Sequence, residues 1–286
     1  ELFGSFGADL PGLTQFLIDA SDFFVANWWI MFGILGATVF GLIEFKNVKF
    51  SYIENQLVIN DISFKIYPGE TTAIVGPTGS GKTTITNLIT KFYEIDSGSI
   101  LIDGRDINEF KLENIRKKIG VILQDVFLFA DTIFNNITLF NNEISIKDVE
   151  RAAKDLEIHD FILSLPGGYD FNVSERGSTL SSGQKQLIAF LRVLVNNPDI
   201  LILDEATSSI DSYSEDLIKN ATKKITMGKT SIIIAHRLST VESADKIIYM
   251  ENGRILEYGN HRELLNIPNG KFKKLYEEQF VENELV

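Results

Sequence analysis

The feature that most constrains the fold is the run GPTGSGKTT at residues 76–84, which has the form G-x-x-x-x-G-K-[ST]. An apolar β-type run, Thr72–Val75, precedes it, and a helical pattern over residues 82–93 follows it. Between a strand and a helix, such glycines let the backbone curl until successive N–H groups face one anion. The helix adds the partial positive charge of its N-terminus. The pattern therefore predicts a phosphate-binding loop.

The phosphate-binding loop predicts roles for its own side chains and for a carboxylate pair further along the chain. Lys82 is placed to reach the β- and γ-phosphates of a nucleotide, and the Thr83 hydroxyl to ligate Mg²⁺. Asp204 and Glu205 end the apolar run Ile200–Leu203, and ligands bind at such C-terminal strand ends. We expect Asp204 to hold Mg²⁺, directly or through water, and Glu205 to polarise the attacking water as a general base. The candidate nucleotide-binding residues of the loop are Gly76, Pro77, Thr78, Gly79, Ser80, Gly81, Lys82, Thr83 and Thr84.

From about residue 43 the sequence alternates short apolar runs with helical patterns. The runs AIVG, ILILD and SIIIA are continuous and apolar, which is typical of central parallel strands covered on both faces. The predicted helices cover residues 82–93, 147–156, 183–196 and 213–225. The predicted strands are Ile43–Phe50, Ile62–Tyr67, Thr72–Val75, Ser99–Ile102, Ile119–Ile122, Ile200–Leu203, Ser231–Ile234 and Lys246–Met250. This order predicts an α/β domain.

Composition excludes several other classes of protein. Cysteine is absent, so a disulfide scaffold, a Cys-ligated zinc site and a thiol nucleophile are excluded. The net charge is 27 − 39 = −12, which argues against a nucleic-acid partner, because phosphate backbones bind clustered Lys and Arg. The chain begins with Glu1 rather than Met, which indicates a fragment, a processed product or a trimmed chain.

The first 42 residues differ from the rest of the sequence. Residues 1–43 contain no Lys or Arg, and residues 23–43 form a run of 21 uncharged residues. As a helix, this run would span about 31 Å, close to the hydrocarbon thickness of a bilayer. Trp28 and Trp29 near its start suit the aromatic belt, and Lys46 and Lys49 beyond its end place the following domain in the cytoplasm. We therefore expect one transmembrane helix over about residues 23–43.

The segment Leu180-Ser181-Ser182-Gly183-Gln184 precedes a predicted helix and ends 20 residues before Asp204. It resembles the LSGGQ signature of ATP-binding cassette (ABC) proteins, with Ser182 in place of a glycine. Other motifs of that family appear in the usual order along residues 43–280. They are Tyr52 (the aromatic residue that stacks on adenine), Gln124 (Q-loop), Ser209-Ile210-Asp211 (D-loop) and His236 (switch histidine). Glu175-Arg176-Gly177 and the stretch with His261, Leu264, Leu265 and Tyr276–Gln279 are similar to the exporters of the family.

The resemblance implies a P-loop NTPase of ABC type over residues 43–280, with a mixed sheet core, a helical subdomain at about 125–195 and a tail at 281–286. It implies ATP and Mg²⁺ as cofactors, with Thr83, Gln124 and Asp204 around the metal and Lys82, Glu205 and His236 in catalysis. The signature would contact the ATP held by a second ABC ATPase domain, so that two domains close head to tail. Whether that dimer is a homodimer or a heterodimer stays open, as does the transported substrate.

For an exporter, the resemblance implies transmembrane domains as partners and an ATPase domain on the cytoplasmic face of the inner or plasma membrane. Val126, Phe127, Leu128 and Phe129 are expected to be exposed, and we expect Phe127 to Phe129, with Glu175, to receive the coupling helices of those domains. His159 and His261 are expected at the surface.

Two other readings remain. Residues 1–42 weakly resemble the inner-membrane platform protein of type II secretion and type IV pilus systems. The alternative is thus a membrane-anchored ATPase of a secretion or pilus assembly system, or a fusion product without transport activity of its own. A soluble cassette ATPase of DNA repair fits less well, because only 98 residues separate Lys82 from Ser181 and they contain no heptad run.

Overall fold

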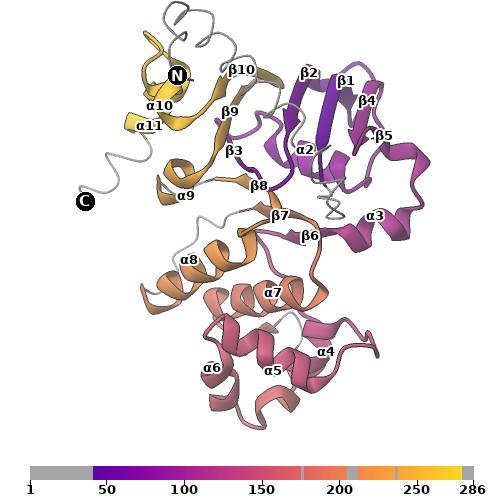
Figure 1. Ribbon diagram of the computed structural model, residues 1–286, viewed down its shortest axis with the longest axis vertical. Helices are drawn as coiled ribbons and strands as arrows, with labels where there is room; N and C mark the ends of the chain where they lie inside the picture. The colour runs from indigo at the N-terminus through magenta and orange to yellow at the C-terminus, as the bar shows by residue number, and fades with distance from the viewer. Residues whose placement is uncertain (1–40, 175–176, 205–211, 236–237, 279–286) are drawn as a thin grey trace, which may run out of the picture. The chain divides into compact units, whose positions relative to one another are not determined.

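The computed structural model describes residues 41–174, 177–204, 212–235 and 238–278 (Figure 1). They belong to one compact unit that begins at Gly41. Within it, two β-sheets and two groups of helices are built around the phosphate-binding loop. The α/β architecture predicted from the sequence is confirmed.

The first sheet is antiparallel and carries the N-terminal part of this unit. In spatial order its strands are β2 (Leu57–Ile66), β1 (Ile43–Ser51), β4 (Ser97–Ile102) and β5 (Arg105–Asp106). Ile43 lies opposite Ile66 on one side and Ile102 on the other, and all three are buried. Alternating buried and exposed residues along β2 show that the sheet has one face against the core.

The second sheet has six strands and forms the centre of the unit. In spatial order they are β10 (Arg254–Gly259), β9 (Lys246–Glu251), β3 (Thr71–Val75), β8 (Thr230–Ile234), β7 (Ile200–Asp204) and β6 (Ile119–Ile122). All pairings are parallel except that of β10 with β9. Every residue of β7 and β8 is buried, which explains the continuous apolar runs Ile200–Leu203 and Ile232–Ile234 within them.

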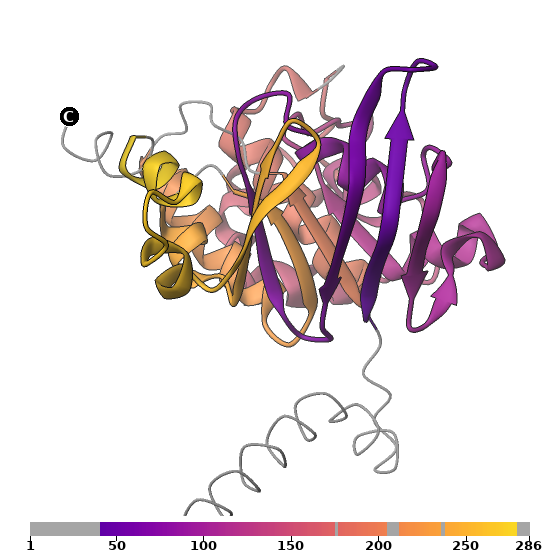
Figure 2. The ribbon, with the colours of Figure 1, turned by 90° about the horizontal axis from the view of Figure 1, so that it is seen from above.

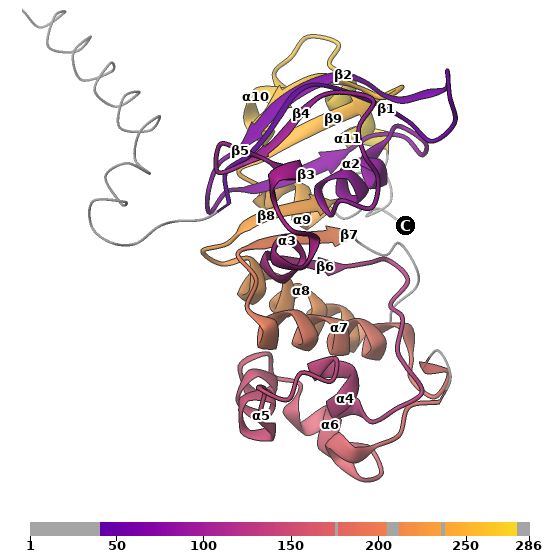
Figure 3. The ribbon, with the colours of Figure 1, turned by 90° about the vertical axis from the view of Figure 1, so that its right-hand side faces the viewer.

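The helices cover the sheets in layers, which Figure 3 shows from the side. Helix α2 lies between the two sheets, α7 and α8 lie beyond β6 and β7, and α4, α5 and α6 lie beyond α7. The helices are α2 (Lys82–Ile89), α3 (Leu112–Lys118), α4 (Ile133–Thr138), α5 (Ile146–Asp155), α6 (His159–Ser164), α7 (Ser182–Asn196), α8 (Ser212–Thr226), α9 (Leu238–Ser243), α10 (His261–Leu265) and α11 (Lys271–Tyr276), with 3₁₀ turns η1 (Ile107–Glu109) and η2 (Gly168–Asp170).

Hydrophobic clusters hold these layers together, and two of them can be traced within the described residues. The larger one joins α4 to α8 with β6, β7 and β8, so the helical layer and the central sheet share one core through residues such as Phe190 and Leu201. The smaller one packs Leu264, Phe272 and Leu275 of α10 and α11 against β3, β9 and α9. Figure 2 shows α10 and α11 at the β10 end of the central sheet, away from β4 and β5.

Several element boundaries differ from those predicted. Helix α2 ends at Ile89 rather than near residue 93, because Lys91 adopts a left-handed φ of 56°. Strand β10 was not predicted, because its residues are mostly exposed or half-buried at a sheet edge and include charges. The short elements α3, α4, α6, α9, α10 and α11 were also missed, since each is seven residues or fewer.

The predicted transmembrane helix falls on residues 23–43, of which 23–40 lie outside the described residues. Its last three residues are not helical. Gly41 has a φ of +119°, the N–H groups of Gly41 and Leu42 donate to the Asp103 carboxylate, and Ile43 begins β1. Among the residues that the structure describes, no helix is both long and apolar enough to cross a bilayer.

Candidate functional site

The phosphate-binding loop runs from the end of β3 to the start of α2. Gly76 has a φ of +145°, and a Cβ there would lie 2.0 Å from the Met250 carbonyl oxygen, so glycine is required. Gly81 caps α2 in a left-handed conformation with a φ of +101°. The loop therefore has the tight curvature that the motif predicted, and it is packed against the end of β9.

Lys82 begins α2 and its side chain folds back into the loop. Its Nζ donates to the carbonyl oxygens of Gly76, at 2.8 Å, and Pro77, at 3.0 Å. The residue is buried, which lowers the pKa of the ammonium group, and the negative charge of Asp204 opposes that shift. The ammonium is thus held in the concave side of the loop by neutral carbonyls, from which phosphate oxygens would draw it with a stronger, charge-assisted bond.

Asp204 ends β7 and faces the first turn of α2. Its Oδ2 lies 3.5 Å from the Thr83 hydroxyl. Burial raises the pKa of this carboxyl, while the charge of Lys82 and the contact with Thr83 act in the opposite direction. A hydroxyl and a carboxylate side by side fit Mg²⁺, which prefers oxygen ligands and completes its shell with water and phosphate. The buried Ser80 hydroxyl, which has no hydrogen-bond partner, adds unused polar capacity to the same loop.

An aromatic cluster stands beside α2 on the antiparallel sheet. Tyr52 follows β1, is about half exposed, and meets Phe50 at 4.8 Å and Tyr93 at 4.9 Å between ring centroids, both edge to face. Its hydroxyl contacts the Thr84 hydroxyl and accepts from the Asn87 amide, both at 3.2 Å. These contacts fix a partly exposed aromatic ring next to the phosphate loop, where an adenine ring could stack.

The remaining residues predicted at this edge follow neighbouring strands. Gln124 is exposed and comes two residues after β6, whose Ile122 lies opposite Leu203 of β7. Gln124 therefore belongs to the same sheet edge as Asp204. Glu205, Ser209, Asp211, His236 and Glu175 lie outside the described residues. In the chain, Glu205 directly follows β7 and His236 comes two residues after the end of β8.

The signature segment forms the start of α7. Leu180 is buried, whereas Ser181 and Ser182 are exposed. Ser181 caps the helix: its hydroxyl accepts from the Gln184 N–H at 3.2 Å, and its own N–H donates to the Gln184 side chain at 2.9 Å. The N–H groups of Ser182 and Gly183, in the first turn, have no intrahelical acceptor. The exposed end of this 15-residue helix is thus suited to an anion brought by another molecule.

The loop after β6 and the residues that follow α4 form an exposed aromatic patch, which we define as Phe127, Phe129, Leu139 and Phe140. Phe129 meets Phe127 at 5.1 Å and Phe140 at 6.4 Å between centroids. Leu128, predicted to be exposed with its neighbours, is fully buried, because alternate side chains of an extended segment point to opposite sides. Leu139 and Phe140 were missed, although two adjacent large apolar residues before a polar stretch were visible in the sequence.

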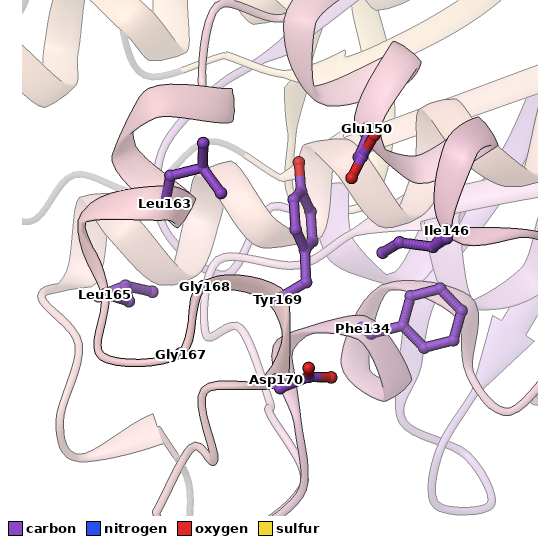
Figure 4. Close-up of a pocket in the computed structure, with 9 residues that line it drawn as sticks. All are labelled: Phe134, Ile146, Glu150, Leu163, Leu165, Gly167, Gly168, Tyr169 and Asp170. Carbon is purple, nitrogen blue, oxygen red and sulfur yellow. The ribbon is translucent and has the colours of Figure 1, made fainter.

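A separate pocket of about 630 Å³ lies in the helical layer (Figure 4). Its walls are apolar, with Phe134, Ile146 and Leu163, and carboxylates of Glu150 and Asp170 stand at its sides. Burial, together with the charge of Glu150, raises the pKa of Tyr169 in this pocket to about 12. None of the predicted nucleotide-binding residues lines it.

The two histidines expected at the surface are half-buried instead. His159 contacts the Tyr169 hydroxyl through Nδ1 at 2.9 Å. His261 lies against Phe272 and Tyr276, so both histidines serve the packing of the fold.

Comparisons with known proteins agree with this geometry. The sequence profile described as ABC transporter matches residues 59–208, so the chain belongs to the ABC transporter family. It is 47% identical over 240 residues to an ATP-dependent lipid A-core flippase of Saccharophagus degradans, covering 84% of this chain and 41% of that protein. A solved structure of a bacterial Atm1-family ABC exporter with ATP bound is 41% identical, with a TM-score of 0.78, over 84% of this chain and 42% of that one.

The chain therefore spans about two fifths of the length of these relatives. The similarity to exporters predicted from the sequence motifs is confirmed, and the chain corresponds to the ATP-binding domain of such proteins.

Proposed function

We propose that this chain hydrolyses ATP with Mg²⁺ as one half of a head-to-tail dimer, and that closure of the dimer drives export through transmembrane domains. The observation that carries the proposal is the meeting of Lys82, Thr83 and Asp204 at the ends of β3 and β7. A cation for phosphate and two oxygen ligands for Mg²⁺ are the minimum that a triphosphate site requires.

Each predicted residue has a role in this site. Tyr52 stacks on adenine, and the N–H groups of the loop from Gly76 to Thr84 surround the phosphates. Thr83, Asp204 and Gln124 hold Mg²⁺, which neutralises charge on the phosphates. Glu205 orients the attacking water, and His236 contacts the γ-phosphate. Because such catalysis depends on positioning and charge stabilisation, losing one of these groups costs rate rather than stability.

A second copy would complete the site. The start of α7 lies on the helical layer, with Ser181 and Ser182 exposed, and its capping leaves first-turn N–H groups available. We infer that this end, with Ser209 and Asp211 of the D-loop, contacts the nucleotide bound by the partner. Two copies related by a twofold axis would each supply the same missing half.

The aromatic patch would transmit conformational changes from the nucleotide site to the transmembrane domains. Phe127 and Phe129 follow Gln124 by only three and five residues, so a change at the Mg²⁺ ligand reaches the patch through one short loop. We propose that Phe127 and Phe129, with Glu175, receive the coupling helices of transmembrane domains, and that the ATPase domain stands on the cytoplasmic side of the membrane. The names of the relatives support this proposal but leave the substrate open.

A mixing experiment tests the dimer with the full chain. Lys82→Ala and Ser181→Arg variants should each lack ATPase activity alone. After subunit exchange at equal amounts, half of the dimers are mixed and each holds one intact site of two, so about a quarter of the wild-type rate should return. A mixture of Lys82→Ala with Asp204→Asn is the control. It should stay inactive, because each mixed dimer then carries one defect in each of its two nucleotide sites.

Two results would contradict the proposal. A Lys82→Ala and Ser181→Arg mixture that stays inactive would show that the signature does not act in the partner's site. A wild-type chain that is inactive alone at every concentration would exclude the homodimer.

A further inference from the structure

The two ends of the proposed nucleotide site lie on different sheets. Tyr52, for the base, follows β1 of the antiparallel sheet, whereas the phosphate loop follows β3 of the central sheet. A nucleotide gains the full binding energy of its base and its phosphates only if the distance between the two sheets is fixed. The contacts between the sheets near the loop therefore bear on binding.

One residue joins the two sheets through its backbone. Gly253 belongs to the two-residue turn between β9 and β10, and its N–H donates to the Ser80 carbonyl of the phosphate loop at 3.1 Å. Its own carbonyl accepts from the Asn60 N–H of β2 at 2.8 Å. The next residue, Arg254, supports the same link, since its guanidinium donates to the Asn60 amide oxygen at 3.0 and 3.2 Å once that amide is oriented to accept.

No other residue type fits at this position. Asn252 and Gly253 have φ angles of 51° and 72°, the conformation of a type I′ hairpin turn. A Cβ on Gly253 would lie 2.3 Å from the Val58 carbonyl oxygen of β2, closer than real Cβ atoms approach. Any side chain would therefore push β2 away from the turn and from the phosphate loop that the turn holds.

We propose that Gly253 is a positioning residue for the nucleotide: it clasps the phosphate loop to the antiparallel sheet, so that adenine and triphosphate are bound by one rigid frame. This inference rests on the proposed function, because it assumes that the loop and Tyr52 bind one ATP molecule. It goes further by naming a residue outside every nucleotide motif that sets how strongly the two ends cooperate.

A double-mutant cycle on Mg-ATP affinity tests the clasp in the full chain. Tyr52→Ala should weaken ATP binding about tenfold in the wild-type background, as the loss of one base–aromatic stack does. In a Gly253→Ala background, where the base and the phosphates are no longer held in one frame, the same change should cost less than about threefold. A residue that only stabilises the fold would leave the effect of Tyr52→Ala unchanged.

The chain offers a matched control in Gly104. The turn Asp103–Gly104 between β4 and β5 has φ angles of 51° and 76°, but a Cβ on Gly104 meets nothing within 4 Å. Gly104→Ala introduces the same backbone strain without displacing β2. Tyr52→Ala should therefore weaken Mg-ATP binding by the full factor of about ten in the Gly104→Ala background. Arg254→Met leaves the turn backbone intact. In that background Tyr52→Ala should weaken Mg-ATP binding by less than tenfold but by more than in Gly253→Ala. This variant keeps the proposal testable if Gly253→Ala does not fold.

The outcomes separate the two proposals. A full tenfold effect of Tyr52→Ala in both the Gly253→Ala and the Arg254→Met backgrounds would overturn the clasp while leaving ATP binding established. Absence of Mg-ATP binding by the wild-type chain would instead overturn the proposed function.

Discussion

Asn136 gives the sharpest test of how the aromatic patch is held. Its side chain is fully buried in α4, directly behind the loop that carries Phe127 and Phe129. Its amide oxygen accepts from the Phe129 N–H at 2.8 Å, and its amide nitrogen donates to the carbonyls of Phe129 and Thr132, both at 3.0 Å. One amide therefore satisfies both backbone groups of Phe129, as a neighbouring strand would.

The cost of Asn136→Ala follows from these bonds. Three well-formed hydrogen bonds at about 1 kcal/mol each give a loss of about 3 kcal/mol, with the Phe129 N–H left without its partner. That is a large part of the roughly 5–15 kcal/mol that stabilises a typical domain, yet it leaves the protein folded. For a domain of this size, the midpoint of thermal unfolding should fall by roughly 6–12 °C.

Thermal unfolding and amide hydrogen exchange check this prediction together. The Phe129 amide should exchange much faster in Asn136→Ala, while amides of β7 and β8 change only with global stability. Asn135→Ala is the matched control. Its side chain is half-buried and its amide donates to the Asp131 carboxylate at 2.7 Å, so its loss should cost about 1 kcal/mol and leave Phe129 protected. A midpoint shift for Asn136→Ala no larger than that of Asn135→Ala would refute the reasoning.

Three further predictions concern charge and coupling. Burial raises the pKa of Glu44, but hydrogen bonds and charge from Lys65 and Lys46 outweigh it, so the pKa in the folded protein is lowered. Glu44 therefore stabilises the folded protein above the unfolded pKa of about 4.3, and this stabilisation is lost as the pH falls below that value. The difference in unfolding free energy between wild type and Glu44→Gln, from urea titrations, should shrink below that pH. Asp204→Asn should reduce Mg-ATP hydrolysis at least about 100-fold with little change in thermal midpoint, because the buried carboxylate already resists ionisation. Phe127→Ser should leave ATP affinity intact and abolish substrate-stimulated ATPase activity in a transporter assembled with transmembrane domains.

The central part of the fold was predictable because its signals are local. A strand buried on both faces is largely apolar, so β3, β7 and β8 were visible as the runs AIV, ILIL and III, and their parallel order placed Lys82, Thr83 and Asp204 at one edge. The phosphate loop needed only its glycines and its neighbours in the chain.

The contacts that position the site were not predictable, because their meaning depends on partners distant in the chain. In the sequence, Gly253 looks like any other turn glycine. Only the close approach of Val58, nearly 200 residues earlier in the chain, distinguishes it from Gly104. Asn136 reads as a polar residue on a short helix, and nothing local shows that it is fully buried. Edge strand β10 was missed for a related reason, since its pattern reflects only one neighbouring strand.

The phosphate end and the base end of the nucleotide site differ in how much substitution they tolerate. The groups at the phosphate end are fixed by chemistry that tolerates little change, since each contacts a phosphate or Mg²⁺ in the proposed mechanism. The base end depends on Tyr52, on the Gly253 link between the sheets, and on the bonds that the Tyr52 hydroxyl donates to Thr84 and accepts from Asn87 of α2. Substitutions in those contacts would alter affinity for ATP while every motif stays intact. Differences in nucleotide affinity that leave the motifs unchanged should therefore arise at residues such as Gly253 and Asn87, which the motifs do not include.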